Sequence, residues 1–121
     1  MSPINFDIMA AKNPEFGRTW SRLSEWFDRY PQLKYVDLRR LSRELSDIPT
    51  EELALTMQIL VQQGYLRPVY RVESPDGILI DQDFASPSEV PERMPDRFHS
   101  GYFYTSEGDI IPGFRVEKVG A

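Results

Sequence analysis

Residues 53–66 read LALTMQILVQQGYL, and this stretch decides the fold. Its apolar side chains recur at intervals of three and four residues up to Val61, the spacing that gathers side chains on one face of a helix. Gly64 follows, and glycine is the residue best able to adopt the left-handed backbone conformation just past a helix end. Leu66 then stands where a hydrophobic contact often closes such an end. We therefore expect a helix over about 50–63, ended by Gly64.

A longer apolar stripe precedes this helix and predicts another one over about 14–30. Asn13 is a good N-cap, and Pro14 costs nothing at the first helical position because its missing N–H would have no partner there. Pro31 ends the pattern. The stripe itself consists of side chains at steps of four and three: Phe16, Trp20, Leu23, Phe27 and Tyr30. Residues 1–13 precede it and are expected to form a loosely docked N-terminal arm.

Leucines predict a further helix over about 36–46, placed between the other two. Leu38, Leu41 and Leu45 share one face of this segment and leave its charged residues outside. After the break at 47–49, Thr50 can cap the next helix, and Glu51 and Glu52 suit the positive end of its dipole.

Beyond Gly64 the apolar period changes from 3.6 to 2, which is typical of strands. Residues 66–73 and 78–81 read as two strands, and Ser74-Pro75-Asp76-Gly77 reads as the turn between them. The proline-rich segment 85–100 is expected to be an irregular connection. A second hairpin is then expected from 102–104 and 110–116, with its turn at 106–109.

The order of helix, helix, helix ended by glycine and hairpin resembles the winged helix-turn-helix domain over residues 33–81, most closely over 53–66. The expected fold class is therefore α+β and winged-helix-like: three helices, a β-hairpin wing and a C-terminal irregular or β extension. The expected organisation is an arm at 1–13, a winged-helix-like domain at 14–84, and a proline-rich connection with a β-hairpin extension at 85–121, packed on the same domain.

The charge pattern argues against the DNA binding for which many winged-helix domains are used. The net charge is −5, and residues 74–121 hold four basic and nine acidic residues. In DNA-binding members the third helix enters the major groove. Here its first turn carries Glu51 and Glu52, and no Lys or Arg lies between Arg43 and Arg67. Phosphates would be repelled by these carboxylates.

We therefore expect a protein–protein adaptor module, with a protein partner or self-association, and keep a DNA-binding transcriptional regulator as the alternative. In that alternative, phosphate contacts would come from basic side chains on the second helix and the wing strand: Arg39, Arg40, Arg43, Arg67 and Arg71. Arg39 and Arg43 are also candidate contacts for an acidic protein partner. The other reading is intrahelical pairing of Arg40 with Asp37 and Glu44, and of Arg43 with Asp47.

Aromatic residues supply the remaining candidate contacts for a partner. Trp26 lies off the helical stripe, so it is either a second core contact or an exposed anchor. Tyr102, Phe103 and Tyr104 are consecutive, and side chains of a strand alternate between its two faces. One face cannot bury all three, so some of these rings are expected to cover another element or a partner.

No catalytic, cofactor or metal site is expected. The chain has no cysteine and one histidine, His99, whereas zinc sites usually need several such ligands. Asp76, Asp81 and Asp83 lack the spacing of a calcium loop. The apolar runs are far shorter than the roughly 20 residues that cross a bilayer, and no basic, then apolar, signal segment begins the sequence. A soluble, cytoplasmic protein without enzymatic activity is therefore expected.

Overall fold

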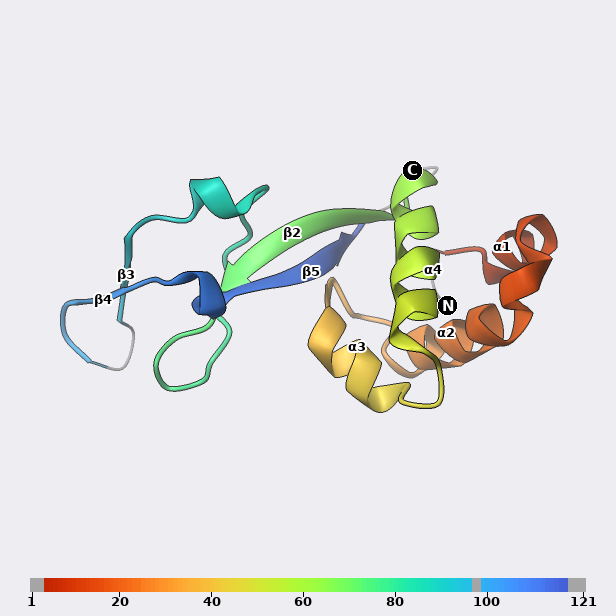
Figure 1. The fold of residues 1–121 in the computed structure, drawn as a ribbon, viewed down its shortest axis with the longest axis horizontal. Coiled ribbons are helices and arrows are strands. Elements are labelled where there is room, and N and C mark those ends of the chain that lie inside the picture. Colours follow the sequence, from red (N-terminus) through yellow and green to blue (C-terminus); the bar gives the residue numbers. More distant parts are fainter. Residues whose placement is uncertain (1–3, 97–98, 118–121) are drawn as a thin grey trace. The chain divides into compact units, whose positions relative to one another are not determined.

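The computed structural model describes residues 4–96 and 99–117 and is a mixed α+β fold, as predicted (Figure 1). In chain order the helices and strands are α1 (Phe6–Lys12), α2 (Gly17–Arg29), β1 (Tyr35–Asp37), α3 (Leu38–Glu44), α4 (Thr50–Gln62), β2 (Leu66–Val72), β3 (Arg93–Pro95), β4 (Tyr102–Tyr104) and β5 (Ile110–Val116). Short 3₁₀ turns lie at 14–16, 87–89 and 107–109.

The chain divides into two compact units, and the boundaries differ from those expected. Residues 1–67 and 115–121 form one unit, which we call the helical unit. Residues 68–114 form the other, which we call the β unit. The boundaries therefore fall within strands β2 and β5, not at residue 84, because part of the expected extension builds one core with the end of β2.

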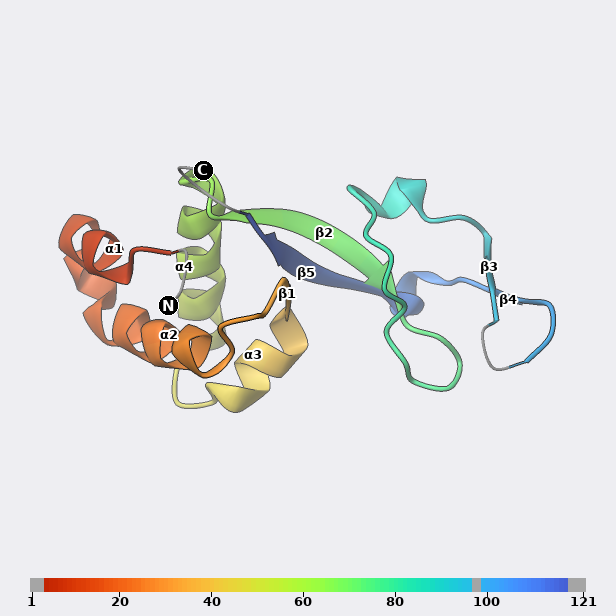
Figure 2. The same ribbon diagram turned by 180° about the vertical axis from the view of Figure 1, so that it is seen from behind.

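The N-terminal segment is a helix and not a loosely docked arm. The Asn5 side chain caps α1 by accepting a hydrogen bond from the backbone N–H of Ile8 at 3.1 Å. Phe6 and Met9 are buried, and the Phe6 ring lies 5.5 Å from the ring of Phe27 on α2. Both ribbon views show α1 beside α2 (Figures 1 and 2). Seven residues alone are too short for a stable helix, so this packing supports it.

The other predicted helices form with shifted starts. The segment 14–30 begins as a 3₁₀ turn and continues as α2. In the segment 36–46, residues 35–37 form strand β1, and Asp37 caps α3 by accepting from the backbone N–H of Arg39 at 2.9 Å. Asp favours a cap over a helix interior because its short carboxylate reaches the free amides.

Helix α4 ends as its sequence predicts. Gly64 has a φ of 82°, and the N–H of Tyr65 donates to the carbonyl of Leu60 at 3.0 Å, as in a Schellman-type helix end. Leu66 beyond it is buried. At the other end, Thr50 is the first helical residue, and the cap position belongs to Pro49 without a side-chain hydrogen bond.

The main sheet has the strand order β1-β5-β2. In the helical unit the N–H of Val116 donates to Lys34 and that of Glu117 donates to Tyr65, both within 2.9 Å. In the β unit the N–H of Glu73 donates to the carbonyl of Asp109 at 2.8 Å. Strand β5 therefore lies between β1 and β2, and the predicted hairpin of 102–104 with 110–116 does not form.

Strand β4 pairs instead with β3, which comes from the proline-rich segment expected to be irregular. The two strands are antiparallel, with Met94 opposite Phe103. Of the predicted first hairpin, the turn at 74–77 forms, with Gly77 at a φ of 79°. Its return strand is reduced to one bridge between Glu73 and Leu79, extended by a hydrogen bond from Ile80 to Val72.

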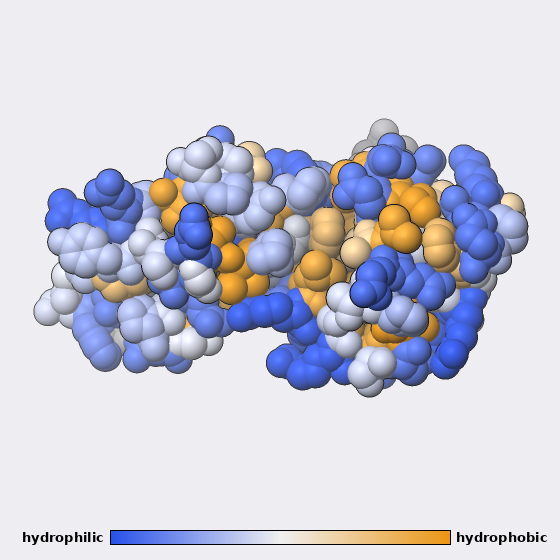
Figure 3. Space-filling model, viewed as in Figure 1, coloured by the Kyte–Doolittle hydropathy of each residue, from blue (hydrophilic) through white to orange (hydrophobic). Residues whose placement is uncertain are grey.

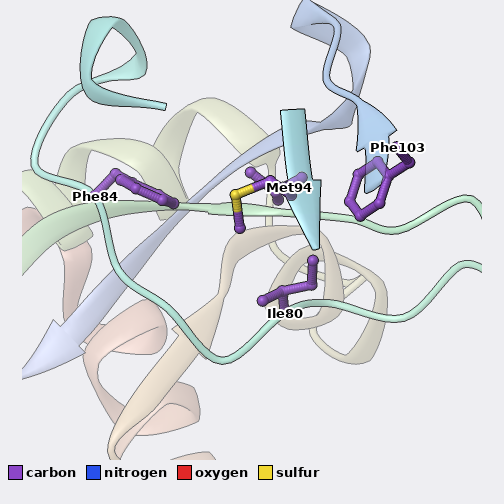
Figure 4. Close-up of a cluster of buried hydrophobic side chains, with 5 residues drawn as sticks. Ile80, Phe84, Met94 and Phe103 are labelled. Carbon is purple, nitrogen blue, oxygen red and sulfur yellow. The ribbon is translucent and has the colours of Figure 1, made fainter. Parts of the chain in front are cut away.

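The β unit has its own hydrophobic core beneath these strands. Buried side chains from four segments form it: Val72, Ile80, Phe84, Met94 and Phe103 (Figure 4). The Arg71 side chain is only 11% exposed, and its guanidinium pairs with Asp81 at 3.1 Å and with Asp83 at 2.6 Å. Among the residues described, no helix is long and apolar enough to cross a bilayer.

Candidate interaction surface

The outer side of the β3–β4 pair carries an exposed aromatic surface. Tyr102 and Tyr104 are 64% and 79% exposed, whereas Phe103 between them is 8% exposed. In the antiparallel register, Arg93 lies opposite Tyr104 and Pro95 lies opposite Tyr102, and both are exposed. Paired residues share one side of a sheet. We call these four residues the tyrosine face.

Phe103 is not a surface residue, and its burial explains how the tyrosine face is held. Phe103 and Met94 point into the core of the β unit (Figure 4). Because side chains alternate along a strand, burying Phe103 turns its two neighbours outward. The core therefore fixes the orientation of both tyrosines. Of the three predicted aromatic contacts, Tyr102 and Tyr104 remain candidates.

A cation already lies on the tyrosine face. The Arg93 guanidinium carbon is 5.1 Å from the centre of the Tyr102 ring, which is within cation–π range. Among the described residues, no cation lies over the ring of Tyr104. One ring therefore has an internal partner, and the more exposed ring presents its faces to the surroundings.

The β unit is strongly acidic. Residues 68–114 contain nine acidic and three basic residues, a formal charge of −6, so the rest of the chain carries +1. Arg71 is held by Asp81 and Asp83, as described above. Glu92 and Glu107 are exposed, and no ion pair involves either of them within the described part of the chain. The tyrosine face therefore belongs to a unit with a large excess of negative charge.

Trp26 is buried and is not an exposed anchor. It is 1% exposed, and its indole N–H donates to Glu44 Oε1 at 3.2 Å. The Tyr30 hydroxyl donates to the same oxygen at 3.0 Å, and Arg40 Nε donates to Glu44 Oε2 at 2.5 Å. Hydrogen bonding to Arg40 is the main reason that the pKa of Glu44 lies below its ordinary value. Trp26 therefore belongs to an internal polar cluster. Of the two predicted alternatives, a core contact or an exposed anchor, the core contact is confirmed.

The arginines of α3 were predicted either to contact a partner or to pair with carboxylates of the same helix, and the structure shows both exposed and paired members. Arg40 pairs with Glu44 as expected for intrahelical pairing, and its guanidinium lies 4.7 Å from the centre of the Tyr30 ring. Asp37, the other predicted partner of Arg40, lies 3.6 Å from Arg39 instead, so that part of the prediction is wrong. Arg43 is exposed, and the described residues include no ion-pair partner for it.

The predicted pair of Arg43 with Asp47 is wrong because Asp47 binds two arginines of α2. Arg18 and Arg22 approach the Asp47 carboxylate at 3.1 Å and 3.0 Å. Hydrogen bonding to Arg22 is the main cause that lowers the pKa of Asp47. These partners lie 29 and 25 residues away in sequence, beyond the reach of a helical-spacing rule.

Two of the arginines proposed for DNA contact are engaged in ion pairs away from α3. Arg67 pairs with Glu117 at 2.8 Å, and Arg71 is the nearly buried partner of two aspartates described above. An arginine held this way would have to give up its partner before it could bind a phosphate. Together with Arg39 and Arg40 of α3, four of the five proposed contacts therefore have a carboxylate within ion-pair distance.

The exposed side of α4 carries no positive charge. Glu51, Leu55, Gln58 and Gln62 follow one another along this side of the helix, and all are exposed. Leu55 is 55% exposed. Figure 3 shows hydrophobic side chains, in orange, among hydrophilic ones over α4. This side of the helix suits an uncharged or apolar contact better than a phosphate backbone.

One grouping of metal-type ligands was missed by sequence reasoning. Asp76, Asp96 and His99 bring one ligand atom each to within 4.8 Å of the others. Asp96 Oδ1 accepts a hydrogen bond from the backbone N–H of His99 at 3.1 Å. Asp76 comes from the 74–77 turn, some twenty residues earlier, so no local spacing indicates the grouping. Asp81 and Asp83 bind Arg71 and do not belong to this grouping.

Comparisons of this chain with family models, with curated proteins and with solved structures found no match.

Proposed function

We propose that this chain is a non-enzymatic protein-interaction module in which a winged-helix-like helical unit carries the β unit as an enlarged wing. In this proposal α2, α3 and α4 are the three helices of the winged helix, and β1, β5 and β2 are its sheet. The chain order helix, strand, helix, helix, strand, wing, strand supports the assignment. The wing would span the chain between β2 and β5.

The observation that carries the functional proposal is the exposure of Tyr102 and Tyr104 on a strand whose remaining side chain is buried. Tyrosine is enriched at the centres of protein interfaces because its ring offers a large contact area at a low cost in conformational entropy. A second observation points the same way: the β unit carries −6, so a nucleic acid would be repelled by the wing.

The observations on basic side chains weaken the DNA-binding alternative. Arg40, Arg67 and Arg71 already hold carboxylates, and the outer side of α4 begins with a glutamate. Arg39 also lies within ion-pair distance of a carboxylate, that of Asp37, which leaves Arg43 as the one of the five without an ion pair among the described residues. One such side chain neutralises too few phosphates for tight binding, because affinity for DNA grows with the number of phosphates contacted.

Quantitative affinity purification from cells of the source organism tests the proposal. The tagged chain would be compared with a Tyr102→Ser/Tyr104→Ser variant and with a matched surface variant on α4, Leu55→Ser/Gln58→Ser. We expect a defined protein to be lost at least several-fold with the tyrosine variant and retained with the α4 variant. Light scattering on the purified chain distinguishes self-association from a separate partner.

An anisotropy titration against mixed duplex DNA at about 50 mM salt provides the opposing measurement, because phosphate contacts are strongest at low salt. Salt-dependent binding that Arg39→Ala/Arg43→Ala abolishes would replace the interaction module with the DNA-binding alternative. Equal recovery of every partner by the tyrosine variant would remove the tyrosine face from the proposal.

A further inference from the structure

We propose that the occupant of the tyrosine face is an extended polypeptide segment with arginine or lysine at alternate positions, bound through cation–π contacts with Tyr102 and Tyr104. The inference rests on the proposed function and adds the chemistry of the partner. Three features of the β unit carry it: the spacing of the rings, the position of Arg93, and the charge of the unit.

The spacing of the two rings matches an extended peptide. Tyr102 and Tyr104 are two residues apart on β4, so their Cα atoms are separated by about 6.7 Å along the strand, at 3.3 to 3.4 Å per residue. Alternate side chains of an extended partner project from one side at the same interval. Two cations at positions i and i+2 of the partner can therefore meet both rings without bending its backbone.

Arg93 shows that the surface accommodates a cation. Its guanidinium carbon lies 5.1 Å from the centre of the Tyr102 ring. Tyr104, which lies opposite Arg93 in the strand register, is 79% exposed, and the described residues place no cation over its ring. A partner cation would bind Tyr104 directly and would compete with Arg93 at Tyr102.

The negative charge of the β unit favours a partner segment with positive charge. Nine acidic and three basic residues attract a cationic segment and repel an anionic one. Arg71 is compensated by Asp81 and Asp83, whereas the exposed Glu92, which directly precedes β3, has no ion pair among the described residues. Among the described residues of β3 and β4, Arg93 is the positive charge that opposes a cation, which makes it the most informative position for a test.

The experiment is an NMR titration of the ¹⁵N-labelled full chain with the hexapeptide Ser-Arg-Ser-Arg-Ser-Arg at about 50 mM salt. The matched peptide Ser-Glu-Ser-Glu-Ser-Glu is the control for charge. We expect the arginine peptide to shift the amide signals of residues 93, 94 and 102–104, with weaker binding at higher salt because exposed charges are screened. The glutamate peptide should leave these signals in place.

Variants separate the contribution of each group. Tyr102→Leu/Tyr104→Leu keeps apolar bulk and removes the aromatic faces, so binding should weaken about five- to thirty-fold if each exposed cation–π contact has its usual strength. Tyr102→Phe/Tyr104→Phe keeps the faces and should bind within about threefold of the parent. Arg93→Gln removes the competing cation and should tighten binding about two- to fivefold.

Three outcomes overturn the inference: no shift with the arginine peptide, equal binding by the leucine variant, or weaker binding after Arg93→Gln. Stronger binding of the glutamate peptide would assign the surface to an acidic partner instead. If these outcomes occur while the Tyr102→Ser/Tyr104→Ser variant still loses its cellular partner, the proposed function stands and only the partner chemistry is wrong. If that variant retains every partner, the proposed function fails together with the inference.

Discussion

Glu44 should be a sensitive polar position of the helical unit, because three donors depend on its carboxylate. Glu44→Ala would leave the indole N–H of Trp26 buried without an acceptor, which costs about 1 to 3 kcal/mol. The Tyr30 hydroxyl is half-buried, so water can replace part of its bond, and the half-exposed pair with Arg40 adds about 0.3 to 0.5 kcal/mol. We expect a loss of about 2 to 3 kcal/mol in the free energy of unfolding.

Urea denaturation followed by tryptophan fluorescence measures this loss. The two tryptophans, Trp20 and Trp26, are both buried in the helical unit, so their emission reports the unfolding of that unit. For a chain of this size the expected loss corresponds to a decrease in Tm of roughly 6 to 15 °C. A loss below about 0.5 kcal/mol would refute the view that Glu44 satisfies a buried donor.

Acid provides an independent check on the same carboxylate. Hydrogen bonding to Arg40, more than to Tyr30 or Trp26, lowers the pKa of Glu44 in the folded chain. Its contribution is therefore fully present above the unfolded pKa, about 4.3, and is lost as the pH falls through the folded value. Glu44→Gln cannot ionise, so the stability difference between parent and variant should be constant at pH 6 to 7 and should shrink from about pH 5 downward. A difference that does not change with pH would contradict the assignment.

Four further substitutions test the packing of the two units. Arg71→Met should destabilise the β unit by about 2 to 4 kcal/mol, because it leaves the 17% exposed carboxylate of Asp83 without this ion pair; hydrogen exchange of the β-unit amides measures it. Met94→Ala should accelerate exchange of the same amides, at a cost of about 2 to 4 kcal/mol for the cavity in the small core. Gly64→Ala should cost about 1 kcal/mol in urea denaturation, because φ is 82° and a Cβ would meet nothing within 4 Å, so only backbone strain opposes it. Thr19→Val should stabilise the helical unit by about 1 kcal/mol, because the buried hydroxyl has no hydrogen-bond partner among the described residues; an unchanged or lower urea midpoint would contradict this.

The parts of the fold that depend on a few neighbouring residues could be predicted from the sequence. The end of α4 is such a case, because the glycine conformation and the hydrogen bond to Leu60 involve residues 60–65 only. The aromatic stripe of α2 is another, since Trp20, Leu23 and Phe27 are all buried. Both features are determined by residues that are close together in the sequence.

Strand pairing depends on distant residues and could not be predicted in the same way. Residues 93–95 end in a proline and lie in a proline-rich segment, which favours an irregular structure. Proline is tolerated at the edge of a two-stranded sheet, where its missing N–H breaks no ladder. The pairing of β3 with β4 depends on Met94 and Phe103 entering a common core with Val72, which no local pattern indicates.

Only part of the candidate surface could be predicted, because the rest also depends on contacts between distant residues. Alternation along a strand predicted that one face could not bury all three rings of residues 102–104, but which of them is exposed depended on which residue joined the core. The burial of Trp26 depends on Glu44, which is 18 residues away. The aspartate partners of Arg71 lie 10 and 12 residues further along the chain, after a turn.

The hydrogen bond that joins Glu73 to Asp109 has a consequence for how this chain can change during evolution. Two backbone positions held at that distance could be bridged by a tight turn of a few residues. The 35 residues from 74 to 108 therefore behave as an insertion, whose length and sequence can vary while the strand partners at its base are kept. Selection can then remodel the tyrosine-bearing segment and leave the buried residues of the helices untouched.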